Sequence, residues 1–447
     1  MSSPDVHAGK WLLGTLVLLA VSLSLDLGLL AYATYALLGA MLTSRLLSRV
    51  WAESLSATRE CSRVSASIGD NVAVVIELNN RSRIPVVWAL VEDHLSRHAL
   101  AFRPPKLDVA GSRIQLVSLK GLGRQTLLYQ LKCEGRGFFQ IGPLVLETGD
   151  LFGLHRRYRL LTEPHFLLVY PKVVLLEDFD IASRRPIGEI RLTHRLYEDP
   201  TRIAGARPYE RGDPLNRIHW RATARASALH SKIYEPTTIA GATILLEFNR
   251  DGFDPQHEPY RSELAVTAAA SLANALYEMG QQVGLVTNGR DAADRIRQEG
   301  WEVDFRTRRA ARTAAAATES EQYRLQPMVV ETRRGPEQLM RILETLARVE
   351  LSTGLRFAEL VTETAGRLPR DATVLAILPS VTAETAVVLG GLRRRGFAVT
   401  AIVVAYHIHE YEQLAGPLAG EGIEVRHLKD QDDIANVCRR CTSGFPA

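Results

Sequence analysis

Residues 242–248, Ala-Thr-Ile-Leu-Leu-Glu-Phe, form an apolar run typical of a β-strand that is covered on both faces. After it, apolar residues recur every four positions from Leu264 to Leu276, and Gly280 follows, which predicts an amphipathic helix with a glycine stop. Strand-like and helical stretches then alternate at short intervals to about Val437. This alternation predicts an α/β domain with a mainly parallel sheet over residues 237–447.

The other elements of this domain are predicted from the same periodicities. We expect strands at 283–287, 373–378 and 397–404, helices at 339–349 and 383–395, and a strand–helix pair from 423 to about 437. Between Arg290 and Pro327 lies an insert rich in Arg and Ala, whose second half has no clear apolar stripe. Such an insert is typical of a solvated helix or a mobile loop.

Upstream, residues 51–172 are expected to form a small β-sandwich. Short apolar runs alternate there with turns that contain Gly or Pro, without a helical period. The expected strands are 72–78, 86–91, 113–119, 125–132 and 144–147. No cluster of His, Asp or Glu in this region has a catalytic pattern, so we expect a spacer or a docking platform.

Residues 1–50 contain the one strongly apolar stretch, Trp11–Leu47. As a single helix it would be about 55 Å long, whereas the hydrocarbon core of a bilayer is about 30 Å thick. Two short spans fit better, with a turn near Ser22–Gly28. The rival interpretation is a cleaved signal peptide with Ala31-Tyr32-Ala33 as its processing site, but the apolar character continues well beyond that point.

The basic residues that flank this stretch predict its orientation. Lys10 precedes it, Arg45, Arg49 and Arg59 follow it, and the turn contains no Lys or Arg. By the positive-inside rule, both ends of the hairpin and all the later domains are expected to lie in the cytoplasm.

Composition excludes several classes of protein. With 46% hydrophobic and 23% charged residues among 447, the chain is neither disordered nor fibrous. A formal net charge of +4 is too small for a nucleic-acid coat, and four cysteines exclude a disulfide scaffold. Cys438 and Cys441 lie close in sequence, but two isolated cysteines do not supply the four ligands of a structural zinc, and their role is left open.

Residues 173–236 connect the two domains and contain the segment densest in charge. Gly212-Asp213-Pro214 predicts a turn. Arg217, Arg221 and Arg225 are spaced by four, so on one helix they would line one face and grip carboxylates. Three interpretations are open: an internal clamp between the domains, a docking face for a partner protein, or a site for phosphate or nucleic acid.

This segment resembles the signature of the bacterial domain-of-unknown-function 58 family. That signature runs Tyr-Glu-x-Gly-Asp, then Arg-x-Ile-x-Trp, then Ala-x-Ala-Arg. The matching positions are Tyr209, Glu210, Gly212, Asp213, Arg217, Ile218, Trp220, Ala224 and Arg225. His219 departs from the pattern, because the family commonly has an acidic residue there. Other family-like stretches are 80–85, 135–137, 150–154 and 169–171.

The resemblance implies a bacterial plasma-membrane protein with soluble domains in the cytoplasm. It further implies that such proteins act with MoxR-type AAA+ ATPases and carry a C-terminal domain similar to von Willebrand factor A domains. Tyr209, Glu210, Gly212, Asp213, Arg217, Trp220, Arg221 and Arg225 are therefore the candidate docking residues.

A von Willebrand A-like domain would hold Mg²⁺ after its first strand, and this chain has Glu247, Asn249 and Asp251 there. Glu adds a methylene, both hydroxyl ligands are replaced, and Pro379-Ser380-Val381 lacks the later Asp. We therefore expect no metal and no cofactor, with a Mg-dependent binding domain as the alternative.

Motifs of catalysis are missing from the sequence. It has no Gly-x-Ser-x-Gly elbow, no phosphate-binding Gly-x-x-x-x-Gly-Lys loop and no His-Glu-x-x-His. His407, His409 and Glu410 have the spacing of ligands on a strand, but a solvent-facing loop is the favoured interpretation. We expect a non-catalytic, membrane-anchored adaptor for other proteins that does not bind nucleic acid, and a hydrolase of envelope components is the weaker alternative.

Overall fold

The computed structural model describes residues 3–25, 27–100, 104–150, 155–175, 198–209, 218–236, 241–299, 326–369 and 372–442. The chain forms two compact units. Unit 1 consists of Met1–Lys172, Gly289–Leu325 and Leu343–Gly354, and unit 2 consists of Val173–Asn288, Gln326–Ile342 and Leu355–Ala447. Segments from within the predicted α/β region thus belong to unit 1.

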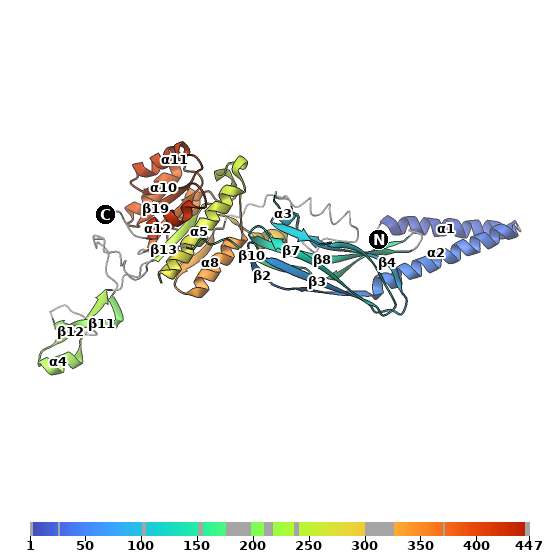
Figure 1. Ribbon diagram of the computed structural model, residues 1–447, viewed down its shortest axis with the longest axis horizontal. Coiled ribbons are helices and arrows are strands. Elements are labelled where there is room, and N and C mark those ends of the chain that lie inside the picture. The colour runs from blue at the N-terminus through green and yellow to red at the C-terminus, as the bar shows by residue number, and fades with distance from the viewer. Residues whose placement is uncertain are drawn as a thin grey trace. The chain divides into compact units, whose positions relative to one another are not determined.

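Unit 1 begins with two long helices that lie side by side, α1 (Ser3–Ser24) and α2 (Gly28–Ser54) (Figure 1). Thr15 Oγ1 on α1 lies 3.9 Å from Met41 Sδ on α2. Among the described residues, α2 is the helix long and apolar enough to cross a membrane, and the apolar part of α1, Leu13–Ser24, is shorter.

Two β-sheets follow, with the orders β1-β3-β7-β5 and β2-β10-β8-β4-β6, and β9 pairs with β8. The strands are β1 (Leu55–Cys61), β2 (Ser65–Ser67), β3 (Asn71–Asn80), β4 (Val86–Leu95), β5 (Leu107–Ala110), β6 (Ile114–Leu119), β7 (Arg124–Cys133), β8 (Gly137–Gly149), β9 (Arg156–Thr162) and β10 (His165–Tyr170), and the short helix α3 spans Arg97–Leu100. Nearly all adjacent strand pairs are antiparallel; the exception is the parallel pair β2–β10.

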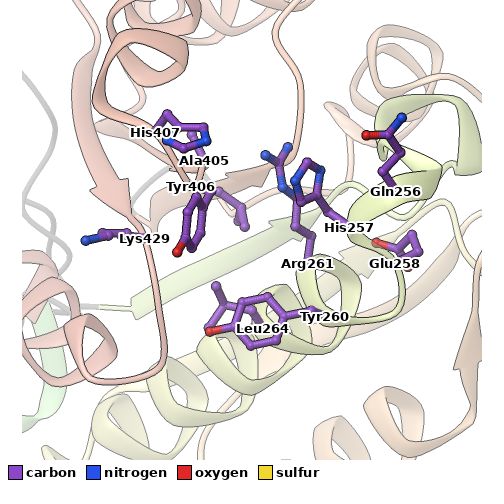
Figure 2. Close-up of a pocket in the computed structure, with 11 residues that line it drawn as sticks. Gln256, His257, Glu258, Tyr260, Arg261, Leu264, Ala405, Tyr406, His407 and Lys429 are labelled. Atoms are coloured by element: carbon purple, nitrogen blue, oxygen red, sulfur yellow. The ribbon is translucent and has the colours of Figure 1, made fainter. Parts of the chain in front are cut away.

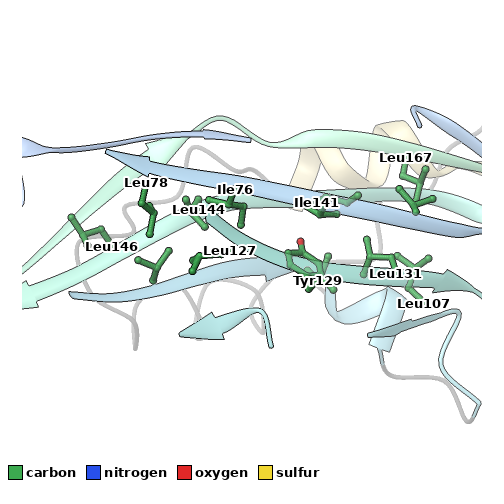
Figure 3. Packing of buried hydrophobic residues seen from close by; sticks show 14 of the residues in the cluster. Ile76, Leu78, Leu107, Leu127, Tyr129, Leu131, Ile141, Leu144, Leu146 and Leu167 are labelled. Atoms are coloured by element: carbon green, nitrogen blue, oxygen red, sulfur yellow. The ribbon is translucent and has the colours of Figure 1, made fainter. Parts of the chain in front are cut away.

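The two sheets share one hydrophobic core. On β7 the residues Leu127, Tyr129 and Leu131 are buried while their neighbours point outward, as the period of two of a strand requires. Figure 3 shows these side chains between the strands, close to Ile76 of β3 and Leu144 of β8. The core therefore lies between the two sheets.

A buried ion pair, Arg59–Asp93, lies within this core. Arg59 Nη2 donates to Asp93 Oδ1 at 2.8 Å, and Tyr129 Oη donates to Asp93 Oδ2 at 2.7 Å. Gly142 has φ of +90°, and a Cβ at this position would overlap the Arg59 guanidinium. Arg59, one of the basic residues that follow the predicted membrane hairpin, is thus buried between the sheets in the folded protein.

Unit 1 also includes β15 (Arg290–Asp291), α6 (Ala292–Glu299), β17 (Val349–Glu350) and the end of α8 (Pro336–Arg348). Ala292 and Ile296 of α6 are buried, so the first part of the Arg- and Ala-rich insert is packed rather than solvated. Residues 300–325 of the insert lie outside the described residues. Arg136 Nη1 donates to the carbonyls of Leu346 and Val349 at 2.5 and 2.8 Å, which caps the end of α8.

Unit 2 contains a six-stranded sheet of order β16-β14-β13-β18-β19-β20. Its strands are β13 (Gly241–Leu246), β14 (Gln282–Thr287), β16 (Met328–Arg333), β18 (Ala372–Leu378), β19 (Val399–Val404) and β20 (Glu424–Leu428). All neighbouring pairs are parallel except β14–β16. The mainly parallel sheet predicted from the alternation is therefore present, and its first strand, β13, is buried along its whole length.

Helices cover this sheet. They are α5 (Tyr260–Glu278), α9 (Phe357–Thr364), α10 (Ala383–Arg394), α11 (Ile408–Gly420) and α12 (Asp433–Thr442). Helices α5 and α12 contact each other, and α10 contacts both α9 and α11. Apolar side chains of α9, α10 and α11 share a core with β18 and β19.

Candidate functional site

The predicted signature segment forms a β-hairpin with a short helix. Strands β11 (Glu198–Pro208) and β12 (His230–Pro236) are antiparallel, and α4 (Trp220–Ala226) precedes β12. Tyr209 N donates to the Leu229 carbonyl at 2.9 Å, which extends the pairing to the first residue of the signature. Glu210, Gly212, Asp213 and Arg217 lie outside the described residues.

Local hydrogen bonds define where α4 begins and ends. His219 Nδ1 accepts from Ala222 N at 3.0 Å and so caps the helix at its start. Thr223 Oγ1 accepts from His230 N at 3.0 Å, which ties the helix to β12. Ser227 has φ of 53°, a left-handed conformation that ends the helix. The residue that departs from the family pattern, His219, therefore has a structural use as a cap.

Of the three arginines spaced by four, Arg217 lies outside the described residues. Ile218 forms a β-bridge to Ser231 and His219 is the N-cap, so α4 begins at Trp220. Arg221 and Arg225 do lie on α4, four residues apart, and both are exposed. Trp220, the first residue of α4, is 68% exposed.

A second candidate region lies at the carboxyl end of β13. Glu247 follows this strand, and burial raises the pKa of its carboxyl to about 8. Its Oε2 atom is buried and has no hydrogen-bond partner. A charged carboxylate in such surroundings is costly, so burial favours the neutral form of this carboxyl.

The neighbouring polar residues are engaged in holding loops. Asn249 Oδ1 accepts from Asp251 N at 3.0 Å, and Asn249 Nδ2 donates to the Leu355 carbonyl at 3.1 Å. Asn288, at the end of the adjacent strand β14, donates to the same carbonyl at 2.8 Å and accepts from Phe248 N at 2.6 Å. The sequence analysis did not identify Asn288, because its partners are distant in the chain.

The three predicted positions thus gather at one edge. The amide oxygen of Asn249 accepts from Asp251 N, and the Oε2 atom of Glu247 is buried. Within the described ranges, no group of three or more His, Cys, Asp and Glu residues is placed to hold a metal ion.

A cavity of about 420 Å³ opens at the carboxyl ends of β19 and β20, next to the start of α5 (Figure 2). Its lining combines aromatic, basic and apolar groups: Gln256, His257, Glu258, Tyr260, Arg261, Leu264, Val404, Ala405, Tyr406, His407 and Lys429. Tyr260 and Tyr406 are about half exposed, at 52% and 49%. In open α/β sheets this edge is where ligands and partners bind.

An ion pair forms one wall of this cavity. Arg261 Nη1 and Nη2 donate to the two carboxylate oxygens of Glu410, both at 2.8 Å. Burial alone would raise the pKa of Glu410, but the bonds from Arg261 outweigh it, and the pKa lies below its usual range. Glu410 therefore does not join His407 and His409 as a metal ligand. His407 and His409 are exposed, as a solvent-facing stretch requires, but they lie at the start of a helix and not on a loop, because α11 begins at Ile408.

Comparison with known proteins gives one family and distant relatives. Residues 205–319 match the model of the family described as "Protein of unknown function DUF58". The uncharacterized protein YeaD of Bacillus subtilis (strain 168) is 24% identical over 259 residues, which cover 58% of this chain and 62% of the relative. The match thus spans less than two thirds of the length of this curated relative.

The solved structures that resemble this chain share little sequence identity with it and have low TM-scores. The VWA domain of SpRpn10 shares 9% identity with a TM-score of 0.29, over 46% of this chain and 99% of that domain. The CARDB domain of the PF1109 protein of Pyrococcus furiosus shares 12% identity with a TM-score of 0.18, over 26% of this chain and 91% of that domain. The match of residues 205–319 to this family model and the similarity to the Bacillus relative support the resemblance to the DUF58 family that the signature around residues 207–225 indicated.

Proposed function

We propose that this protein is a non-catalytic, membrane-anchored adaptor that binds other proteins, together with a MoxR-type AAA+ ATPase, in the assembly or maturation of membrane complexes. The supporting observation is Trp220, a large aromatic side chain that is 68% exposed at the start of α4. Arg221 and Arg225 are exposed on the same helix. Tryptophan and arginine are the residues that most often carry the binding energy of protein interfaces.

In this proposal, the partner protein binds the hairpin that β11, α4 and β12 form. A tryptophan side chain in water is costly unless a partner covers it, and the two nearby guanidinium groups suit an acidic surface. The non-catalytic part of the proposal rests on the sequence, which has none of the nucleophile, phosphate-loop or metallohydrolase motifs. The ATPase is named because of the family resemblance alone.

Trp220→Ala is expected to weaken capture of the MoxR-type ATPase encoded in the same genome by at least tenfold, because it removes a central interface anchor. The measurement is a pull-down of the purified full-length protein with that ATPase, followed by titration. Leu116→Ala on β6 is the matched control, since Leu116 is 70% exposed but lies in unit 1. Equal affinity of the Trp220 variant and the wild type would remove the hairpin from the proposal.

We further propose that α1 and α2 both cross the plasma membrane and that the remaining domains are cytoplasmic. A periplasmic reporter enzyme fused after residue 60 is therefore expected to be inactive, and a cytoplasmic reporter at the same site is expected to be active. A fusion in the turn at Leu27, between the helices, is expected to give the opposite pair of results. An active periplasmic reporter after residue 60 would contradict this topology.

A further inference from the structure

We infer that unit 1 carries a binding site for the phosphate head group of an anionic phospholipid, between α2 and β9. This inference rests on the proposed membrane anchoring. The site is a cavity of about 320 Å³ lined by Leu42, Arg45, Leu46, Arg49, Glu53 and Arg157. Apolar and basic groups thus line one opening at the end of the predicted membrane helix.

The cavity lies at the level where the helix pair changes from apolar to charged. The contact between Thr15 and Met41 sets the pairing of the two antiparallel helices. Lys10 lies five positions before Thr15 on α1, and Leu46 lies five positions after Met41 on α2. These two residues are therefore at the same height along the helix pair. Both helices therefore leave the apolar stretch at the same depth, which is where lipid phosphates lie.

Side chains alternate between the two faces along β9, and this alternation places two of its arginines toward α2. Arg156 and Tyr158 both bond to Glu147, while Arg157 and Arg159 face the other way. Arg159 Nη1 donates to the carbonyls of Ala52, Glu53 and Leu55 at 3.0, 3.0 and 3.2 Å, which caps the end of α2. This cap holds β9 against the helix, and Arg157 then lines the cavity beside Arg45 and Arg49.

The cavity has an excess of positive charge. Its three arginines face one carboxylate, Glu53, which pairs with Arg49 at 2.9 Å. In the part of the chain that the structure describes, neither Arg45 nor Arg157 has a carboxylate within 4.0 Å, and Arg157 Nε is buried without a hydrogen-bond partner. Guanidinium groups bind phosphate oxygens bidentately, so these two arginines are suited to one phosphate group.

The apolar groups of the site favour a lipid over free phosphate. Leu42 and Leu46 are 46% and 63% exposed, and they would contact the glycerol and first methylenes of a lipid. A loop of the first sheet lies at the same end of unit 1, because Arg81 N donates to the Ser54 carbonyl at 2.9 Å. Near it, Leu122 is 64% exposed, as expected of a loop tip that dips into a membrane surface.

The test is native mass spectrometry of the full-length protein released from detergent, with phosphatidylglycerol, phosphatidylcholine and inorganic phosphate in separate titrations. We expect tighter binding of phosphatidylglycerol than of phosphatidylcholine, and weak binding of inorganic phosphate. Arg45→Gln and Arg157→Gln should each weaken phosphatidylglycerol binding about fivefold. Arg395→Gln, at the end of α10 in unit 2, is the control and should change nothing.

Two results would overturn the inference: equal affinity for the two lipids in the wild type, or unchanged binding in both arginine variants. Binding of inorganic phosphate as tight as that of the anionic lipid would also overturn it. Because Arg45 is exposed, its replacement leaves the fold intact and keeps the test interpretable. An alkaline wash of membranes separates this failure from that of the anchoring: protein that is washed off contradicts both proposals, and protein that stays without lipid preference contradicts only this one.

Discussion

Replacing Asp93 by Ala is expected to lower the free energy of unfolding of unit 1 by about 3–5 kcal/mol, because it leaves the charge of Arg59 buried without its partner. Both side chains of this pair are fully buried, at 2.8 Å from each other. Tyr129 Oη loses its acceptor at the same time. The measurement is urea denaturation of the full-length protein in detergent, followed by hydrogen exchange of peptides from β7 and β8.

Lys132→Ala is the matched control. Lys132 lies on β7, as Tyr129 does, but its ion pair with Glu134 is exposed, so no measurable loss is expected. The double variant Arg59→Met/Asp93→Leu should recover part of the loss, since it removes both charges. Recovery stays partial because Arg59 Nη1 also donates to the Ile141 carbonyl at 2.8 Å. A loss below 1 kcal/mol for Asp93→Ala would show that the buried pair does not support the sandwich.

Glu247→Gln is expected to stabilise unit 2 more as the pH rises. Burial raises the pKa of Glu247 to about 8, against 4.5 in the unfolded chain. Between these values the unfolded state releases a proton that the folded state keeps, so stability falls as the pH rises through this window. Glutamine stays neutral and avoids this loss, which amounts to about 3 kcal/mol at pH 7.

Urea denaturation of the protein at pH 5, 7 and 8, followed by hydrogen exchange of peptides from unit 2, measures this difference in stability. The free energy of unfolding of the Glu247→Gln variant should exceed that of the wild type only slightly at pH 5 and by the full amount at pH 8. Asp251→Asn removes a carboxylate from the same loop, at an exposed position, and should show no such trend. A stabilisation that is equal at pH 5 and pH 8 would mean that Glu247 is charged in the folded protein.

Periodicity predicted much of the fold and missed elements for physical reasons. The continuous apolar run at 242–248, which overlaps β13, and the stripe on α5 were recognised because burial on both faces, or on one face, leaves a clear pattern. Strand β1 was missed, since its sequence Leu-Ser-Ala-Thr-Arg-Glu-Cys has few apolar residues and its buried Arg59 depends on a partner 34 positions away. Helix α11 was missed because it contains Pro417 and its first half is mostly polar.

The candidate site was predictable only where it depends on local sequence. A spacing of four placed Arg221 and Arg225 on one helix, but the spacing carries no information about where the helix starts. That start depends on the bridge from Ile218 to Ser231, a contact between strands. Asn288 and the cavity beside Arg261 and Glu410 arise because parallel strands end at one edge, which brings together residues 149 positions apart.

The junction of α2 and β1 has a mechanical consequence. Ser54 ends the helix and Leu55 begins the strand, so no flexible tether separates them. Trp51 is 2% exposed within the core between the sheets, and Arg159 clamps the last carbonyls of the helix. The junction between the helix and the strand is therefore rigid. If α2 crosses the membrane as proposed, a force that acts on the sheets would reach the helix directly and tilt it against the surrounding lipid.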